Sequence, residues 1–311
     1  MKLSHLRTFV AIADNSGFAR AASRLNLTQS AASRQLSALE AELGVSLFDR
    51  NGRHVKLTFE GEDLLRRSRR LLADANSLGE RARALRGGLV GTLRISAAPQ
   101  AIENVVAPFL ADFQRRHPGV EVELVESITG RHGQLERGDI HLAIMPSFEA
   151  QNFQRRLLYP NYLLAVVAKT HRLGRRAVVD LAELADEPLL LLKQWFGARA
   201  RFDAACNAAE IHPRVLLESG APTTLVALAA VGYGVALIPS NIQMLQTGVR
   251  SVLLAHRKVP IGWWSSVAWN QNRFLPPYAG EFVGELVARL RHAYPGRDLT
   301  RRAPQLPRPK E

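Results

Sequence analysis

The stretch LNLTQSAASRQLSALEAELG, residues 25–44, decides how the N-terminal part of the chain folds. Thr28 is a residue type favoured as a helix N-cap, and Gly44 stands where a helix commonly ends. The apolar residues between them recur at helical spacing and share one face: Ala32, Leu36, Leu39 and Leu43. The stretch therefore predicts a helix between Thr28 and Gly44 with one buried face.

The opposite face of this helix is polar and almost free of acidic residues over its first three turns. Gln and Arg side chains form paired hydrogen bonds with base edges, and Ser can reach bases or phosphates. We predict that Gln29, Ser33 and Arg34 read base edges, while Ser30 contacts phosphates or the minor groove. Together with Thr28 at the helix start, these residues form the candidate DNA-reading face.

A short helix over residues 18–24 and a tight turn over residues 25–27 are predicted before this reader helix. Two helices joined by a turn, the second with a polar N-terminal face, are typical of a helix-turn-helix DNA reader. Residues 1–16 predict one more helix, which supports the pair through Phe9 and Phe18. A generic amphipathic helix pair is the alternative.

A basic hairpin is predicted after the reader helix, over residues 45–58. Asn51-Gly52 is a strong hairpin turn with apolar residues on both sides. Four basic residues surround the turn: Arg50, Arg53, His54 and Lys56. A basic hairpin beside a reader helix is a wing, and we predict that Arg50, Arg53 and Lys56 contact phosphates or the minor groove. A solvated loop is the alternative.

A long helix is predicted after Thr58, which is a suitable N-cap. Leucines recur every seven residues along this helix: Leu64, Leu71, Leu78 and Leu85. Small residues occupy the partner heptad position, so two copies of the helix could approach closely and form a dimer. The helix could instead pack against the rest of its own chain. Residues 86–91 are rich in glycine and predict a hinge.

In their order, these elements resemble the N-terminal part of a LysR-type transcriptional regulator. The resemblance is specific over residues 3–61 and looser over residues 91–294. It rests on these stretches: Gln29–Leu36, Leu39–Gly44, Leu47–Arg50, Leu57-Thr58, Gly61 and Gly91–Ile95. The resemblance implies a homodimer or a tetramer built as a dimer of dimers, a cytoplasmic location and a small-molecule effector. RNA polymerase is a further candidate partner.

The charge of the chain agrees with nucleic-acid binding. The formal net charge is +13. Residues 1–90 hold fifteen Lys and Arg against nine Asp and Glu, whereas the much longer remainder holds twenty-six against nineteen. A basic N-terminal third suits a polyanion, and double-stranded DNA is the predicted partner.

Several classes of protein are disfavoured by the sequence. Cys206 is the only cysteine, so no internal disulfide or cysteine cluster can form; we expect an inert buried thiol, with a reactive thiol as the alternative. The longest apolar run, residues 225–239, is too short for a membrane span, and polar residues interrupt any signal peptide. Neither metal-ligand spacing of histidines nor a nucleophile motif is present, so we predict no catalytic residues, cofactor or metal.

Residues 91–294 predict an α/β domain of two lobes. Short apolar strands alternate with amphipathic helices, which argues for parallel sheets with crossover helices. The predicted lobes are about 91–162 with 268–294 (lobe I) and about 163–267 (lobe II). Such a clamshell is like the periplasmic binding proteins, as the resemblance also implies. Residues 295–311 are rich in Pro and Arg and predict a disordered tail.

Open α/β sheets bind ligands beyond the carboxyl ends of their strands. Hydroxyl, amide and aromatic side chains follow the predicted strands here, with four cations nearby: Arg131, Lys193, Arg199 and Arg201. Such a set suits a small organic anion, although ordinary helix capping is an equal alternative for each residue. The candidate effector-binding residues are Gln100, Ser127, Thr129, Ser147, Trp195, Phe196 and Thr223.

The sequence thus predicts an α+β multidomain chain with three parts. These are an N-terminal winged helix-turn-helix (1–58), a long linker helix (59–88) and a C-terminal two-lobe α/β effector domain like the periplasmic binding proteins (91–294). We predict a sequence-specific transcriptional regulator in which effector binding shifts the lobes, and with them the spacing of paired readers and the bending of DNA. The rival hypotheses are a solute-binding or transport module and an enzyme built on the α/β lobes.

Overall fold

The computed structural model divides the chain into two compact units, which are described separately. Residues 1–88 form one unit together with the short segment 136–139, and the other residues form the second. The structure describes residues 1–15, 17–49, 55–85, 90–242, 247–300 and 305–309, with the backbone alone at 83–85 and 299–300. Among these residues, no helix combines the length and the apolar character that a bilayer crossing requires.

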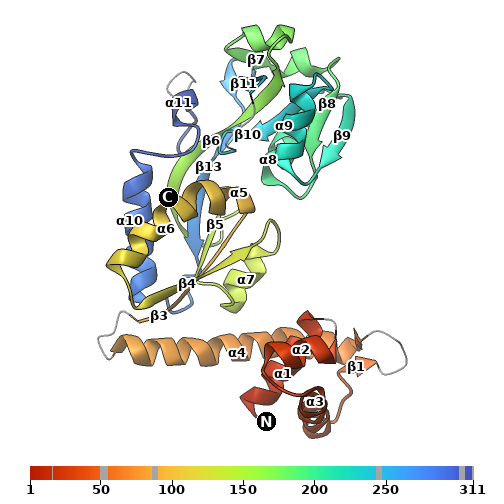
Figure 1. Cartoon of the computed structure of the whole chain (residues 1–311), viewed down its shortest axis with the longest axis vertical. Coiled ribbons are helices and arrows are strands. Elements are labelled where there is room, and N and C mark those ends of the chain that lie inside the picture. Colours follow the sequence, from red (N-terminus) through yellow and green to blue (C-terminus); the bar gives the residue numbers. More distant parts are fainter. Residues whose placement is uncertain (16, 50–54, 86–89, 243–246, 301–304, 310–311) are drawn as a thin grey trace. The chain divides into compact units, whose positions relative to one another are not determined.

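Three short helices and a hairpin form the first part of the N-terminal unit (Figure 1). Their bounds are α1 (Leu3–Asp14), α2 (Phe18–Arg24), α3 (Gln29–Leu43), β1 (Phe48–Asp49) and β2 (Lys56–Leu57). The helices enclose a small core in which Phe9 meets Phe48 edge-on, with ring centroids 5.6 Å apart. The structure confirms the predicted reader helix, because Thr28 caps α3 and Gly44 ends it with a positive φ of 71°.

The long helix α4 (Phe59–Leu85) follows the hairpin. Its predicted cap is present, since the Gly61 backbone N–H donates to Thr58 Oγ1 at 2.9 Å. The pairing of β1 with β2 is antiparallel, as a hairpin requires. Five basic or turn-forming positions of that hairpin, residues 50–54, lie outside the described residues.

Lobe I of the second unit is a five-stranded sheet flanked by helices. In spatial order its strands are β4 (Val120–Glu126), β3 (Gly91–Ala97), β5 (Leu142–Pro146), β13 (Gly262–Trp269) and the first half of β6 (Gln154–Ala168). Its helices are α5 (Pro99–Ala101), a π-helical turn (Ile102–Val106), α6 (Ala107–Arg116), α7 (Arg131–Arg137) and α10 (Pro277–Leu290). The sheet and α6 and α10 share one core, where Phe109 and Phe113 both meet Phe282 edge-on.

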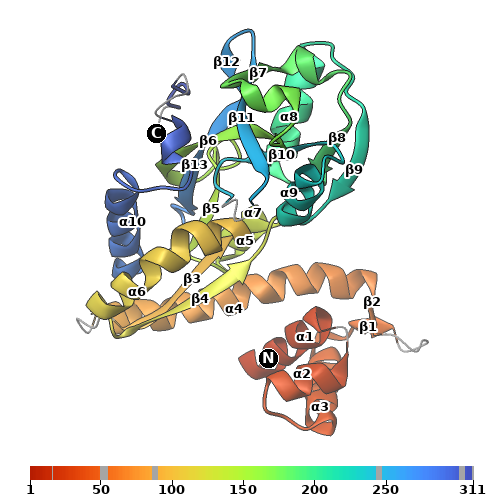
Figure 2. The ribbon, with the colours of Figure 1, turned by 45° about the horizontal axis from the view of Figure 1, so that its top comes forward.

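Lobe II continues the same sheet and adds two main helices (Figure 2). Its strands are the second half of β6, β10 (Val235–Pro239), β8 (Leu189–Leu192), β9 (Val215–Ser219), β11 (Val249–His256), β7 (Val178–Asp180) and β12 (Val259–Pro260). Its helices are α8 (Gly197–Ala208), α9 (Pro222–Ala230) and two 3-10 turns (Arg172–Arg175, Leu181–Leu184). The sequence did not predict β7, β11 or β12.

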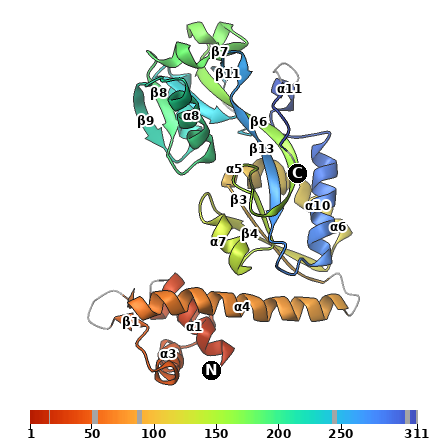
Figure 3. The same ribbon diagram turned by 180° about the vertical axis from the view of Figure 1, so that it is seen from behind.

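Two neighbouring strands, β6 and β13, carry the chain between the lobes (Figures 1 and 3). The first half of β6 pairs with β13, and residues 163–168 of β6 pair with β10 and β11 of lobe II. Because β13 pairs with lobe I strands from Gly262 onward, the return crossing lies near residue 261. The sequence predicts this boundary at about residue 268. A continuous apolar run gave no sign of where the crossing falls.

The structure describes parts of the C-terminal segment that the sequence predicts to be a disordered tail. A short helix, α11 (Arg297–Thr300), follows lobe I, and Leu306 packs against the core of lobe II. Arg308 stacks over Trp264, with its guanidinium 5.7 Å from the ring centroid. Composition favoured disorder here, but a single leucine supplies an apolar anchor that a count of Pro and Arg does not reveal.

Gly262 sits where the crossing strand β13 meets this segment, and we expect Gly262→Ala to destabilise the protein. A Cβ at this position would lie 2.3 Å from the Asn161 carbonyl oxygen and 2.8 Å from a Leu306 methyl carbon. Such overpacking costs roughly 1–3 kcal/mol, measurable as a lower melting temperature. The matched control is Gly284→Ala in α10, where nothing lies within 4 Å. Gly284→Ala should raise the free energy of unfolding by up to about 1 kcal/mol. An unchanged melting temperature of Gly262→Ala would contradict the close approach of Asn161 and Leu306 to residue 262.

Candidate nucleic-acid interface and ligand cavity

The polar face of α3 projects into solvent. Gln29, Ser30, Ser33 and Arg34 are all exposed. On the other side of the helix, Thr8 Oγ1 donates to Gln35 Oε1 at 2.6 Å, which ties α3 to α1. Arg34 makes no hydrogen bond or ion pair with any residue that the structure describes. The arrangement leaves a guanidinium, an amide and two hydroxyls exposed on one helix, and groups of these types hydrogen-bond with bases and phosphates.

Thr28 has a structural role of its own. Its Oγ1 accepts a hydrogen bond from the Ala31 backbone N–H at 3.2 Å and lies 3.1 Å from Ser30 Oγ. Thr28 therefore fixes the start of α3, and its predicted contact with DNA remains a prediction.

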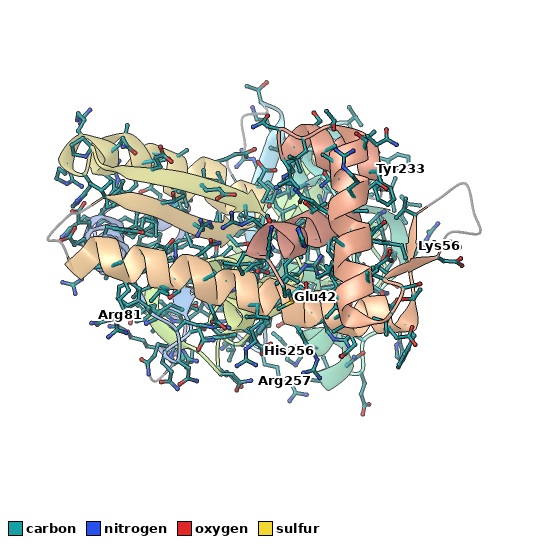
Figure 4. All side chains as sticks on the ribbon, turned by 90° about the horizontal axis from the view of Figure 1, so that it is seen from below. Glu42, Lys56, Arg81, Tyr233, His256 and Arg257 are labelled. Atoms are coloured by element: carbon teal, nitrogen blue, oxygen red, sulfur yellow. The ribbon has the colours of Figure 1, made fainter. Side chains whose placement is uncertain are left out.

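The wing is described only in part. Lys56 is exposed, and its side chain projects from β2 away from the helices (Figure 4). Arg50 and Arg53 lie outside the described residues. An exposed cation of this kind is able to pair with a phosphate.

The leucine row of α4 divides into two parts. Leu64 is half-buried against the core of the N-terminal unit, beside Leu65. Leu71 is 46% exposed and Leu78 is 71% exposed. The side chain of Leu85 lies outside the described residues. The first leucine of the predicted seam thus packs at least in part within its own unit, whereas the next two leave apolar surface exposed among the described residues.

A cavity of about 80 Å³ lies between the lobes of the second unit. Apolar walls come from both lobes, and its polar lining comes from six residues: Gln100, Arg131, Tyr159, Asn161, Asn241 and Ser265. Tyr159 and Asn161 are each only 1% exposed. Asn161 Nδ2 donates to Ser265 Oγ at 2.5 Å. The register of β6 and β13 shifts by one residue between Ser265 and Ser266, and such bulges commonly re-aim side chains beside binding sites.

Three polar atoms of this cavity have no hydrogen-bond partner among the described residues. They are the Tyr159 hydroxyl, Asn161 Oδ1 and Asn241 Oδ1. Burial raises the pKa of the Tyr159 hydroxyl, and weak hydrogen-bonding interactions with the Asn241, Ser265 and Asn161 side chains, none with the geometry of a formed hydrogen bond, oppose the rise. Tyr159 therefore keeps its proton and can donate it in a hydrogen bond.

The predicted effector-binding residues do not gather in one place. Gln100 and Phe196 line the cavity between the lobes. A separate hollow of about 470 Å³ holds Ser127, Thr129 and Trp195. Ser147 lines a third, of about 870 Å³, which also borders Arg201 and the segment around Leu306. Thr223 is exposed at the start of α9 and lines none of these three.

The cations near the strand ends are already engaged. Arg131 donates to the Ser127 carbonyl oxygen at 2.6 Å and to Glu149 Oε2 at 3.2 Å. Arg199 donates to the Leu192 carbonyl oxygen at 2.9 Å and pairs with Asp203 and Glu218. Burial lowers the pKa of Arg199, but these two carboxylates outweigh it and the pKa is raised.

The remaining two cations lie over aromatic rings. Arg201 donates to the Gly262 carbonyl oxygen at 3.1 Å, and its guanidinium lies 5.1 Å from the centre of the Phe148 ring. Lys193 Nζ lies 4.9 Å from the centre of the Trp195 ring. Neither of these lines the cavity between the lobes. The four cations that the sequence suggested for binding an anion are therefore either paired with carboxylates or located outside the cavity between the lobes.

Sequence reasoning missed Tyr159, Asn161, Asn241 and Ser265. Tyr159 and Asn161 lie within β6, not beyond the end of a strand, so the rule on carboxyl ends passed over them. One signal was available: Asn161 interrupts the otherwise apolar run of β6, where a buried amide needs a reason. Within the described ranges, no three His, Cys, Asp or Glu side chains are grouped to hold a metal ion.

Two family models match the chain. The model described as "Bacterial regulatory helix-turn-helix protein, lysR family" matches residues 3–62. The model described as "LysR substrate binding domain" matches residues 86–291. The two matches coincide with the reader helices and with the two-lobe domain.

Similar full-length proteins are known. YnfL of Escherichia coli (strain K12), an uncharacterized HTH-type transcriptional regulator, is 30% identical, over 94% of this chain and 99% of that protein. The HTH-type transcriptional regulator IlvR of Caulobacter vibrioides is 32% identical, over 90% of this chain and 96% of that protein. The crystal structure of full-length CbnR with its target DNA is 25% identical and covers 93% of this chain and 100% of that chain, with a TM-score of 0.67. Full-length OxyR from Pseudomonas aeruginosa, as a variant, is similar in fold, with a TM-score of 0.70 at 23% identity, over 95% of this chain and 99% of that chain.

Cys206 should be inert in the native protein. It is buried in α8, and burial, with a smaller effect of Asp203, raises the pKa of its thiol to about 11. At pH 8 only about one thiol in a thousand would then be ionised. We expect native protein to react with iodoacetamide at least about a hundredfold more slowly than protein unfolded in urea. Equal rates in the two samples would mean that the thiol is accessible and reactive.

Proposed function

The chain belongs to the LysR family of DNA-binding transcriptional regulators, and on that premise we propose how its own residues read DNA and sense a small molecule. The observation that carries the proposal is the exposed polar face of α3, with Arg34 unengaged by the described residues. In this proposal α3 lies in the major groove, where Gln29, Ser33 and Arg34 meet base edges. Ser30 and Lys56 hold phosphates, and Arg50 and Arg53 are proposed to join them from the wing.

A second copy of the chain is proposed to pack along α4. Leu71 and Leu78 expose apolar surface in a row at heptad spacing, which is costly in water and suits a partner helix. Two readers held by such a pair would meet two half-sites of a palindromic operator. A dimer of dimers and a contact with RNA polymerase remain predictions of the sequence.

The cavity between the lobes is the proposed effector site. Its walls come from both lobes, so a bound ligand contacts elements that move relative to each other when the lobes close. The sequence predicts a small organic anion as the effector. Binding would shift the lobes and change the spacing and angle of paired readers, and with them the energy of bending DNA.

Arg34→Ala should lose sequence discrimination. If Arg34 forms paired hydrogen bonds with a base, its removal costs roughly 1–3 kcal/mol of discrimination between specific and random DNA. The specific fragments are first selected from genomic DNA by retention on the protein, and affinities are then compared at one salt concentration. Arg214→Ala, which removes an exposed positive charge from the second unit, is the matched control and should keep the discrimination. An equal loss on specific and random DNA would contradict base reading by Arg34.

Leu78→Lys should weaken self-association. The substitution places a charge where the proposed partner helix buries a leucine, and a symmetric pair loses that contact twice. Each buried leucine is worth roughly 1.5–3 kcal/mol, so we expect the dimer dissociation constant to rise at least about a hundredfold, measured by analytical ultracentrifugation. The control is Asn76→Lys, which adds the same charge at an exposed position off the leucine row. A Leu78→Lys protein that stays dimeric would remove α4 from the interface.

A further inference from the structure

In the cavity between the lobes, two hydrogen-bond acceptors and one donor have no hydrogen-bond partner among the described residues. Two of the unpartnered atoms, Asn161 Oδ1 and Asn241 Oδ1, are amide oxygens that accept hydrogen bonds. The third, the Tyr159 hydroxyl, can donate. Folded proteins leave few such atoms unsatisfied, so a cluster of three in one cavity points to a ligand or ordered water that completes them.

The cavity is also electrically balanced. Arg131 is the one charged side chain among the residues that line it, all of which the structure describes. Arg131 is itself buried and paired with Glu149, whose carboxylate offsets its charge. A carboxylate ligand would meet this neutral pair and two amide oxygens that it cannot satisfy, because an ionised carboxylate has no hydrogen to donate.

We propose that the effector is a small uncharged molecule that carries at least two hydrogen-bond donors and one acceptor, as an amide or a polyol does. The inference rests on the proposed function, in which this cavity is the effector site. Ligand donors would satisfy Asn161 and Asn241, and the Tyr159 hydroxyl would donate to the ligand acceptor. A cavity of about 80 Å³ leaves room for roughly five to eight non-hydrogen atoms. The ligand class therefore differs from the anion that the sequence predicts.

Compounds that differ in charge but hardly in size test this inference. The probes are lactamide against lactate and propionamide against propionate, at equal millimolar concentrations with the full-length protein. A ligand that binds only the folded state raises the melting temperature. We expect each amide to raise it more than the matching carboxylate does, most clearly for lactamide, which carries a hydroxyl as well. A larger shift with either carboxylate, or no difference within either pair, would overturn the proposal.

Two variants then locate the binding. Tyr159→Phe removes the donor and should weaken lactamide binding about tenfold, measured by calorimetry. Tyr278→Phe is the matched control, because that hydroxyl donates to the Thr92 carbonyl oxygen at 3.3 Å and does not line the cavity. Tyr278→Phe should leave the affinity for lactamide unchanged. Equal affinities of the Tyr159→Phe and Tyr278→Phe proteins would place lactamide elsewhere and overturn the inference.

Asn161→Asp distinguishes the two ligand classes even if Tyr159→Phe fails to fold. A carboxylate oxygen still accepts a hydrogen bond from a neutral ligand, so lactamide binding should fall less than about tenfold, whereas lactate would be repelled. Loss of lactamide binding with lactate binding retained would overturn the inference. Failure of the proposed function is seen separately, since a chain that selects no DNA fragments is not the proposed regulator whatever its ligand.

Discussion

The two-lobe unit depends on the antiparallel pairing of β6 with β13, the strands that pass between the lobes. Asn161 of β6 donates to Ser265 of β13 within this pairing, and both residues line the cavity. The segment around Leu306 adds a third contact at the same place, against Gly262. A ligand that binds Asn161 therefore touches the strands about which the lobes would turn. A small molecule bound here would act directly on the angle between the two lobes, which a ligand bound within one lobe would not do.

The N-terminal unit was predictable because its signals are local. A cap at Thr28, a stop at Gly44 and four apolar residues at helical spacing lie within twenty residues, and the structure has the helix that they predict. In the second unit the same reasoning found β8 and most of lobe I, where strands are apolar runs bounded by turns. It failed for β7 and β12, because short edge strands are defined by their partners. It also failed for β11, an eight-residue strand that pairs with β6 and β7. The position of the lobe boundary likewise depends on the strands with which β13 pairs.

The candidate DNA-reading face and the cavity between the lobes also differ in how local their sequence signals are. The candidate DNA-reading face is one side of one helix, so its residues follow from their spacing along the sequence. The cavity takes Gln100 from lobe I, Asn161 and Ser265 from the crossing strands, and Phe196 from lobe II. Gln100 and Phe196 could be predicted because they follow strands. Asn161 and Ser265 could not be paired from sequence, because a one-residue bulge at Leu158 of β6 shifts the register of β6 against β13.

The positively charged side chains have different surroundings in the two units. The exposed cations of the reader, Arg34 and Lys56, keep their charge available to a polyanion, and the basic composition of the first ninety residues expresses this directly. The arginines around the strand ends of the second unit raise the same count, yet Arg131 and Arg199 are buried against carboxylates. An arginine buried in this way stabilises the fold only together with its partner, and adds little positive potential to the cavity. Net charge therefore agrees with the macromolecular partner of this family, whereas the proposal for the small molecule rests on neutral hydrogen-bonding atoms that have no partner among the described residues.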